Sequence, residues 1–170
     1  IGQRKQKSIE IIAIGISTGA PNALRLILPE LDKNLPAPIL IVQHMPPVFT
    51  EEFAKSLDRI CPLEVKEARE GDILQKGRVF IAPGDTHLKI QKQRLANIIK
   101  ISKSAPVNGH RPSVDVLFAS VASVYNHNCM AIIMTGMGKD GGREIGNIFR
   151  SGGVTIAQEA SHEVESPLNF

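Results

Sequence analysis

Residues 11–19 read Ile-Ile-Ala-Ile-Gly-Ile-Ser-Thr-Gly, an apolar run that ends in a Gly-x-Ser-x-Gly motif. Residues 21–28 follow with apolar side chains at helical spacing, so a strand, a tight turn and a helix are predicted here. In that context the motif exposes a serine hydroxyl at the end of a sheet. Ser17 is therefore a candidate nucleophile, provided that a nearby base accepts its proton.

Two further apolar runs end in residues of matching chemistry. Residues 38–42 are followed by His44, and residues 130–134 are followed by a glycine-rich loop that contains Asp140. The carboxyl ends of strands in an open parallel sheet line one crevice, so Ser17, His44 and Asp140 could converge there. Parallel strands joined by crossover helices predict an α/β fold with a doubly wound, mostly parallel sheet.

The middle of the chain has the pattern of short antiparallel strands. Residues 78–81, 87–90 and 95–101 are apolar or alternating runs separated by turn residues. This spacing predicts an antiparallel β meander inserted into the α/β pattern. Residues 144–150 and 154–157 are expected to form the last helix and the last strand.

Two polar residues have the sequence context of helix N-caps. Thr50 is expected to cap a helix that ends before Pro62, and Ser113 to cap a helix that runs through Val124. Asp115 then falls inside that second helix. It is the rival to Asp140 as the acid of the site, and its helical position makes it the weaker candidate.

The composition is that of one globular domain of 170 residues, with 42% hydrophobic and 22% charged residues. No apolar run is long enough to cross a membrane. The formal net charge is +3 and the basic residues are scattered, so nucleic acid is not an expected partner. Cys61 and Cys129 adjoin apolar residues, which favours free buried thiols and a reducing cytoplasm.

Each motif alone also has a simpler interpretation. Ser17 could be only a helix N-cap, and the glycines around it could cradle an anion in a non-catalytic α/β binding module. Metal binding is not expected, because no His or Cys pair has the spacing of metal ligands. Other histidines compete with His44 for the role of base; they are His87, His110, His127 and His162.

The order serine, acid, histidine of α/β-hydrolases would use Ser17, Asp140 and His162. This order is disfavoured, because strands precede the nucleophile strand in that fold and here Ser17 follows the first strand.

Taken together, the motifs resemble closely the catalytic domain of the chemotaxis protein-glutamate methylesterases, the CheB family. The resemblance rests on residues 15–19, 43–50 and 135–141. Further similar blocks lie at residues 81–87 and 111–118. It covers most of the chain, roughly residues 10 to 160.

The resemblance implies a function and a set of roles. The substrate would be a glutamate γ-methyl ester on the cytoplasmic helices of a chemoreceptor, hydrolysed to glutamate and methanol without a cofactor. Some relatives also deamidate receptor glutamines. Ser17 would be the nucleophile, His44 the base and then the acid, and Asp140 the residue that orients His44.

The same resemblance points to the groups that would stabilise the oxyanion. The backbone N–H of Met137 would be the main donor, with Thr18 in support, inside a loop whose glycines include Gly136 and Gly138.

The resemblance also implies how the chain is organised. Residues 1–8 are expected to be the remnant of a linker, and residues 9–170 a methylesterase catalytic domain without the receiver domain that family members usually carry ahead of it. The segment after Ala160 departs from the family pattern. The expected partners are chemoreceptor helices and a receiver domain in the full-length protein, in the cytoplasm and without membrane insertion.

Overall fold

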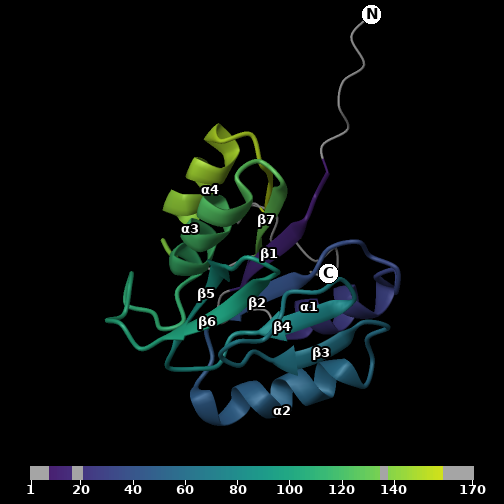
Figure 1. Ribbon diagram of the computed structural model, residues 1–170. Helices are drawn as coiled ribbons and strands as arrows, with labels where there is room; N and C mark the ends of the chain where they lie inside the picture. The colour runs from purple at the N-terminus through teal and green to yellow at the C-terminus, as the bar shows by residue number, and fades with distance from the viewer. Residues whose placement is uncertain (1–7, 17–20, 135–137, 159–170) are drawn as a thin grey trace, which may run out of the picture.

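A computed structural model describes residues 8–16, 21–134 and 138–158 (Figure 1). Within these residues a parallel sheet has the strand order β3-β4-β2-β1-β7-β8. The strands are β1 (Ile11–Ile16), β2 (Ile39–Gln43), β3 (Glu64–Glu67), β4 (Arg78–Ile81), β7 (Cys129–Met134) and β8 (Val154–Ala157). The reversal of strand order at β1 confirms the doubly wound α/β fold.

Helices cover both faces of the sheet. They are α1 (Pro21–Ile27), followed by a 3-10 turn (Leu28–Glu30), α2 (Pro47–Asp58), α3 (Val114–Tyr125) and α4 (Gly142–Arg150). In Figure 1, α3 and α4 lie on one side of the sheet and α1 and α2 on the other. Each pair covers its own hydrophobic core, because every apolar strand residue must face one of the two layers.

The antiparallel part of the fold is smaller than the sequence predicted. β5 (His87–Lys92) and β6 (Asn97–Ser102) form a two-stranded antiparallel hairpin that packs with α3. The prediction of a meander was wrong for its first strand, because Arg78–Ile81 lies in the parallel sheet between β2 and β3. Phe80 faces one core while Val79 and Ile81 face the other, as expected of a strand that is buried on both sides.

The start of α2 also differs from the prediction. The helix begins at Pro47 rather than after Thr50, because proline is well suited to the first helical position. Thr50 is buried inside the helix, where its hydroxyl donates to Glu67 and accepts from the backbone N–H of Gly84. This residue ties α2 to the ends of β3 and β4 instead of capping the helix.

The predicted N-cap of α3 is confirmed. Ser113 caps α3, with its hydroxyl accepting from the backbone N–H of Val116. Cys61 and Cys129 are free, although only Cys129 is fully buried. In the part of the chain that the structure describes, no helix has both the length and the apolar character that crossing a membrane requires.

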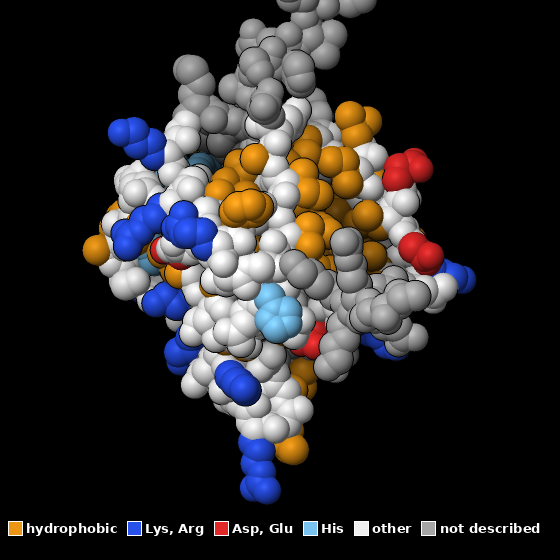
Figure 2. All heavy atoms as spheres, turned by 90° about the horizontal axis from the view of Figure 1, so that it is seen from above, with side chains coloured by type: hydrophobic (Ala, Val, Ile, Leu, Met, Phe, Trp, Pro, Cys, Tyr) orange, Lys and Arg blue, Asp and Glu red, His pale blue; other side chains and the backbone are white. Residues whose placement is uncertain are grey.

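One part of the sheet face beside α1 stays open within the described residues. Ile132 pairs directly across from Ile156 at the β8 edge, and the Ile156 side chain is 49% exposed. Figure 2 shows apolar side chains gathered on the face of the molecule that is seen from above. Among the described residues, an apolar side chain is therefore partly exposed at the β8 edge of the sheet.

The N-terminus of α3 sits unusually close to the carboxyl end of β1. A Cβ atom placed on Gly15 would lie 2.3 Å from Cγ1 of Val114, the first residue of α3. A Cβ atom placed on Gly141, which has φ +92°, would lie 2.7 Å from the same valine atom. The absence of two side chains thus lets the first turn of α3 reach the end of the sheet where the candidate site residues lie.

We expect Gly15→Ala to destabilise the protein by roughly 1–3 kcal/mol, because the new methyl group overlaps Val114. Urea unfolding measures the loss. Gly142→Ala is the matched control, since nothing lies within 4 Å of a Cβ atom there, and its midpoint should barely move. Equal midpoints for the two variants would contradict the close packing of α3 on β1.

Candidate active site

His44 and Asp140 form a hydrogen-bonded pair at the carboxyl edge of the sheet. His44 directly follows β2, and Asp140 lies between β7 and α4. Nε2 of His44 is 2.8 Å from Oδ2 of Asp140, and the two side chains are only 10% and 1% exposed. An ionised carboxylate only accepts hydrogen bonds, so Nε2 donates. Nδ1 is therefore the ring nitrogen left to accept a proton.

The Asp140 carboxylate is held by the first turn of α3. It accepts hydrogen bonds from the hydroxyl of Ser113 (2.7 Å) and from the backbone N–H groups of Val114 (2.7 Å) and Asp115 (3.1 Å). Free N–H groups and the helix dipole make a helix N-terminus favourable for negative charge. The orientation of Asp140 is therefore fixed by backbone as well as by side chains.

These contacts also decide the charge of Asp140. Burial alone would raise the pKa of its carboxyl group, but the hydrogen bonds from His44, Ser113 and the α3 backbone outweigh burial and hold that pKa well below its usual range. Asp140 is therefore ionised at neutral pH.

Asp115 lies inside α3 as predicted, but its carboxylate has a structural role that sequence reasoning missed. The side chain is buried and accepts from the backbone N–H of Glu144 in the first turn of α4 (3.0 Å). It also accepts from the Asn108 side chain (2.7 Å). An acid among the apolar residues of this helix was the available signal, since a buried carboxylate needs such partners.

A second histidine lies against the first. The rings of His44 and His110 are stacked, with centroids 3.6 Å apart and an angle of 3° between their planes. Sequence reasoning treated His110 only as a loop histidine, because nothing in the spacing of the two residues indicates that their rings meet. Burial and the neighbouring His44 lower the pKa of His110, while Asp140 partly opposes that shift.

Several predicted site residues lie outside the described residues: Ser17, Thr18, Gly136 and Met137. Gly138 is described and is exposed. Ile16, which precedes Ser17, accepts a hydrogen bond from the backbone N–H of His44 (3.3 Å) and pairs in register with Met134. The three strands that carry the motifs therefore end side by side at one edge of the sheet.

The remaining described histidines have other surroundings. His87 is fully buried, with Nε2 bonded to the carbonyl oxygen of Ala105 (2.9 Å) and Nδ1 accepting from the backbone N–H of Ser113 (3.2 Å). His127 lies exposed in the turn after α3, and His162 is outside the described residues. His87 is thus a structural residue that joins β5 to the loop before α3.

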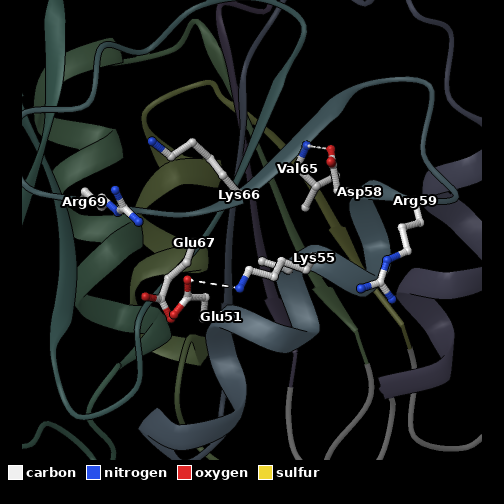
Figure 3. Close-up of a pocket in the computed structure, with 9 residues that line it drawn as sticks. Glu51, Lys55, Asp58, Arg59, Val65, Lys66, Glu67 and Arg69 are labelled. Carbon is white, nitrogen blue, oxygen red and sulfur yellow. Dashed lines mark hydrogen bonds and ion pairs between the residues drawn. The ribbon is translucent and has the colours of Figure 1, made fainter.

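A polar groove lies on the surface between α2 and β3 (Figure 3). Its charges are partly paired, since Lys55 contacts Glu51 (3.4 Å) and Asp58 accepts from the backbone N–H of Val65 (2.8 Å). The lining residues do not include a serine, cysteine or histidine. Across the described residues, no group of three or more His, Cys, Asp or Glu side chains could hold a metal ion.

Comparison with known proteins places this chain in a family. A family model described as CheB methylesterase matches residues 12–166. The chain is 56% identical over 162 residues to a protein-glutamate methylesterase/protein-glutamine glutaminase of Treponema denticola, covering 95% of this chain and 44% of that protein. A relative of the same name from Treponema pallidum is 53% identical, with 92% and 39% covered. The chain thus spans less than half the length of these relatives.

A solved structure agrees with the sequence relatives. The crystal structure of the Thermotoga maritima CheB methylesterase catalytic domain superimposes with a TM-score of 0.86 at 44% sequence identity, covering 90% of this chain and 81% of that one. The family model spans nearly the whole described sheet and its helices. On this evidence the chain belongs to the CheB methylesterase family.

Proposed function

We propose that this chain is a serine hydrolase that demethylates glutamate γ-methyl esters of chemoreceptors and releases methanol. The observation that carries the proposal is the buried His44–Asp140 pair next to the end of β1, in a chain of this family. A non-catalytic anion-binding module would not need an ionised acid bonded to a histidine. The names of the relatives, which include protein-glutamine glutaminase, extend the proposal to the deamidation of receptor glutamines.

In the proposed reaction, His44 Nδ1 accepts the Ser17 hydroxyl proton as the Ser17 oxygen attacks the ester carbonyl carbon. The imidazolium then returns that proton to the departing methoxide, so methanol leaves and an acyl-enzyme remains. Water attacks the acyl-enzyme with His44 as base, and the products are glutamate and regenerated Ser17. Asp140 stays ionised and stabilises the imidazolium in both steps.

Other groups have proposed supporting roles. The backbone N–H of Met137, with Thr18 in support and the loop glycines Gly136 and Gly138 around it, would stabilise the oxyanion. The substrate would be presented by cytoplasmic helices of a methyl-accepting chemoreceptor, and the reaction would take place in the cytoplasm. In the longer protein a receiver domain would restrain the site by covering it and would add no catalytic group.

We expect Ser17→Ala to lower methanol release from a methylated receptor fragment by roughly 10⁴-fold or more, because no nucleophile remains. A fluorophosphonate probe should label the wild type and not the variant. Ser151→Ala, at the exposed end of α4, is the matched control and should keep full activity. Near-wild-type turnover by folded Ser17→Ala protein would overturn the assignment of the nucleophile.

His44→Ala should abolish turnover, whereas His162→Ala should leave it unchanged. The measurement is the rate of methanol release by each variant under the same conditions. If His162→Ala is the inactive variant, the serine, acid, histidine order of α/β-hydrolases is correct instead.

Asp140→Asn should give a folded enzyme that is slower by roughly 10³- to 10⁴-fold, because His44 loses the partner that fixes its orientation and tautomer. It should also lower the free energy of unfolding at pH 7 by roughly 1–3 kcal/mol, since several donors lose a charged acceptor. Asp115→Asn is the comparison and should cost stability but less than tenfold in rate.

The stability effect of Asp140 has a defined pH dependence. The pKa of Asp140 is lowered by folding from the ordinary value of 3.8, so its stabilisation is complete above that value and is lost as the pH falls toward the folded pKa. The difference in unfolding free energy between the wild type and Asp140→Asn should therefore narrow below about pH 4. A constant difference from pH 7 to pH 3 would show that the charge of Asp140 is not the cause.

A further inference from the structure

We propose that His110 is a positioning residue whose ring holds the imidazole of His44 in the plane in which it meets Asp140. The inference rests on the proposed function for its effect on the rate. The contact between the two rings does not depend on that function, so part of the test below is independent of turnover.

The hydrogen bond to Asp140 leaves one motion of His44 poorly controlled. The ring turns about its Cβ–Cγ bond, and rotation about such a bond to a planar group has broad minima. Both ring nitrogens lie off that axis, and Nδ1 lies further from it than Nε2, which bonds Asp140. Rotation would therefore displace Nδ1, the nitrogen that must face the reacting proton, further than Nε2, and it would also disturb the hydrogen bond from Nε2 to Asp140.

The ring of His110 supplies the missing constraint. With the two planes only 3° from parallel and the centroids 3.6 Å apart, any substantial turn of the His44 ring drives its edge into His110. Stacked planar rings resist this motion without forming a directional bond. His110 thus acts on the orientation of Nδ1, and Asp140 acts on the position of Nε2.

His110 can perform this role only if its own loop is held in place, and the loop has contacts that hold it. The backbone of His110 exchanges two hydrogen bonds with Val107 (2.9 and 3.0 Å) across a turn in which Asn108 and Gly109 have φ of 55° and 75°. The Asn108 side chain donates to Asp140 (3.1 Å) and to Asp115 (2.7 Å). The turn that carries His110 is therefore bonded to both acids behind the site.

Arg111, the next residue, forms further hydrogen bonds that hold the same loop. The Arg111 guanidinium donates to Asp85 through Nε (3.0 Å) and Nη2 (2.5 Å), and it donates to the carbonyl oxygens of Lys103 and Ser104. These carbonyls lie at the start of the loop, so Arg111 joins the end of the loop to its beginning. Asp85, just after β4, anchors the closed loop to the sheet.

The surroundings of the stack, burial above all, favour an uncharged His110. Burial first and then His44 lower the pKa of His110, and Asp140 is the group that opposes them. Asp115 is bonded to Asn108 and Arg111 is paired with Asp85. A neutral ring can remain stacked on His44 when that ring becomes an imidazolium, so the constraint persists through the proposed catalytic cycle.

The test compares His110→Phe, which keeps a flat ring, with His110→Ala, which removes it. In His110→Ala we expect kcat for methanol release to fall about 10- to 100-fold from loss of orientation, with KM within about twofold of the wild type. His110→Phe should retain most of kcat. The control is His127→Ala, an exposed histidine outside the site, which should match the wild type.

A second readout does not use turnover. In the full 170-residue chain, NMR follows the proton on Nε2 of His44. It should give a slowly exchanging low-field signal in the wild type and in His110→Phe, and a broadened signal in His110→Ala. This readout stands even if Ser17→Ala shows that the proposed reaction is wrong. Should His110→Ala fail to fold, Asp85→Asn, which loosens the loop without touching either ring, must show the same broadening.

Three results would overturn the proposal. One is an unchanged kcat together with an unchanged Nε2 proton signal in His110→Ala. Another is an equal loss in His110→Phe and His110→Ala, which would mean that a ring nitrogen of His110 matters rather than its flat face. The third is a change confined to KM, which would make His110 a substrate-binding residue.

Discussion

The whole site depends on the carboxylate of Asp140 at the N-terminus of α3. The two carboxylate oxygens of Asp140 accept hydrogen bonds from two backbone N–H groups and from the Ser113 hydroxyl at the start of α3. They also accept hydrogen bonds from the Asn108 side-chain amide and from His44. A buried carboxylate is costly unless every lone pair finds a donor. The same contacts that make burial of Asp140 tolerable also aim it at His44, so the orientation of the pair follows from the need to satisfy the charge.

Two helices each have backbone N–H groups that are bonded by a carboxylate from the other helix or from the loop before it. Asp140 precedes α4 and satisfies the first turn of α3, while Asp115 in α3 satisfies the backbone N–H of Glu144 in α4. Asn108 bonds both acids. Gly15 and Gly141 leave the space that brings Val114 and the start of α3 to the sheet edge. Asp140, the candidate acid, is therefore placed by the docking of α3 and α4, and a change in that docking would reach His44.

The features of the fold and the site that could be predicted from the sequence are those that depend on local patterns of residues. The apolar runs before Ser17, His44 and Asp140 predicted parallel strands whose ends meet, and the contact between His44 and Asp140 agrees with that prediction. The position of Asp115 inside a helix followed from apolar spacing in the same way. Residues 78–81 were assigned to the wrong sheet, because a short apolar strand has the same pattern in a hairpin and in a parallel sheet.

Other features depend on contacts between distant segments. The stacking of His110 on His44, the two donors of Asn108 and the role of Thr50 inside α2 require the relative placement of several elements. No local pattern carries that information.

The charge state of Asp140 is the central claim, and carbon NMR of its side-chain carboxyl carbon over a pH titration tests it most directly. The account predicts a chemical shift typical of an ionised carboxylate that does not change as the pH falls through the ordinary aspartate value of 3.8, up to the point where the protein unfolds. A native-state titration of Asp140 at or above that value would contradict it, because a carboxyl held by the α3 N-terminus and His44 cannot take up a proton so readily.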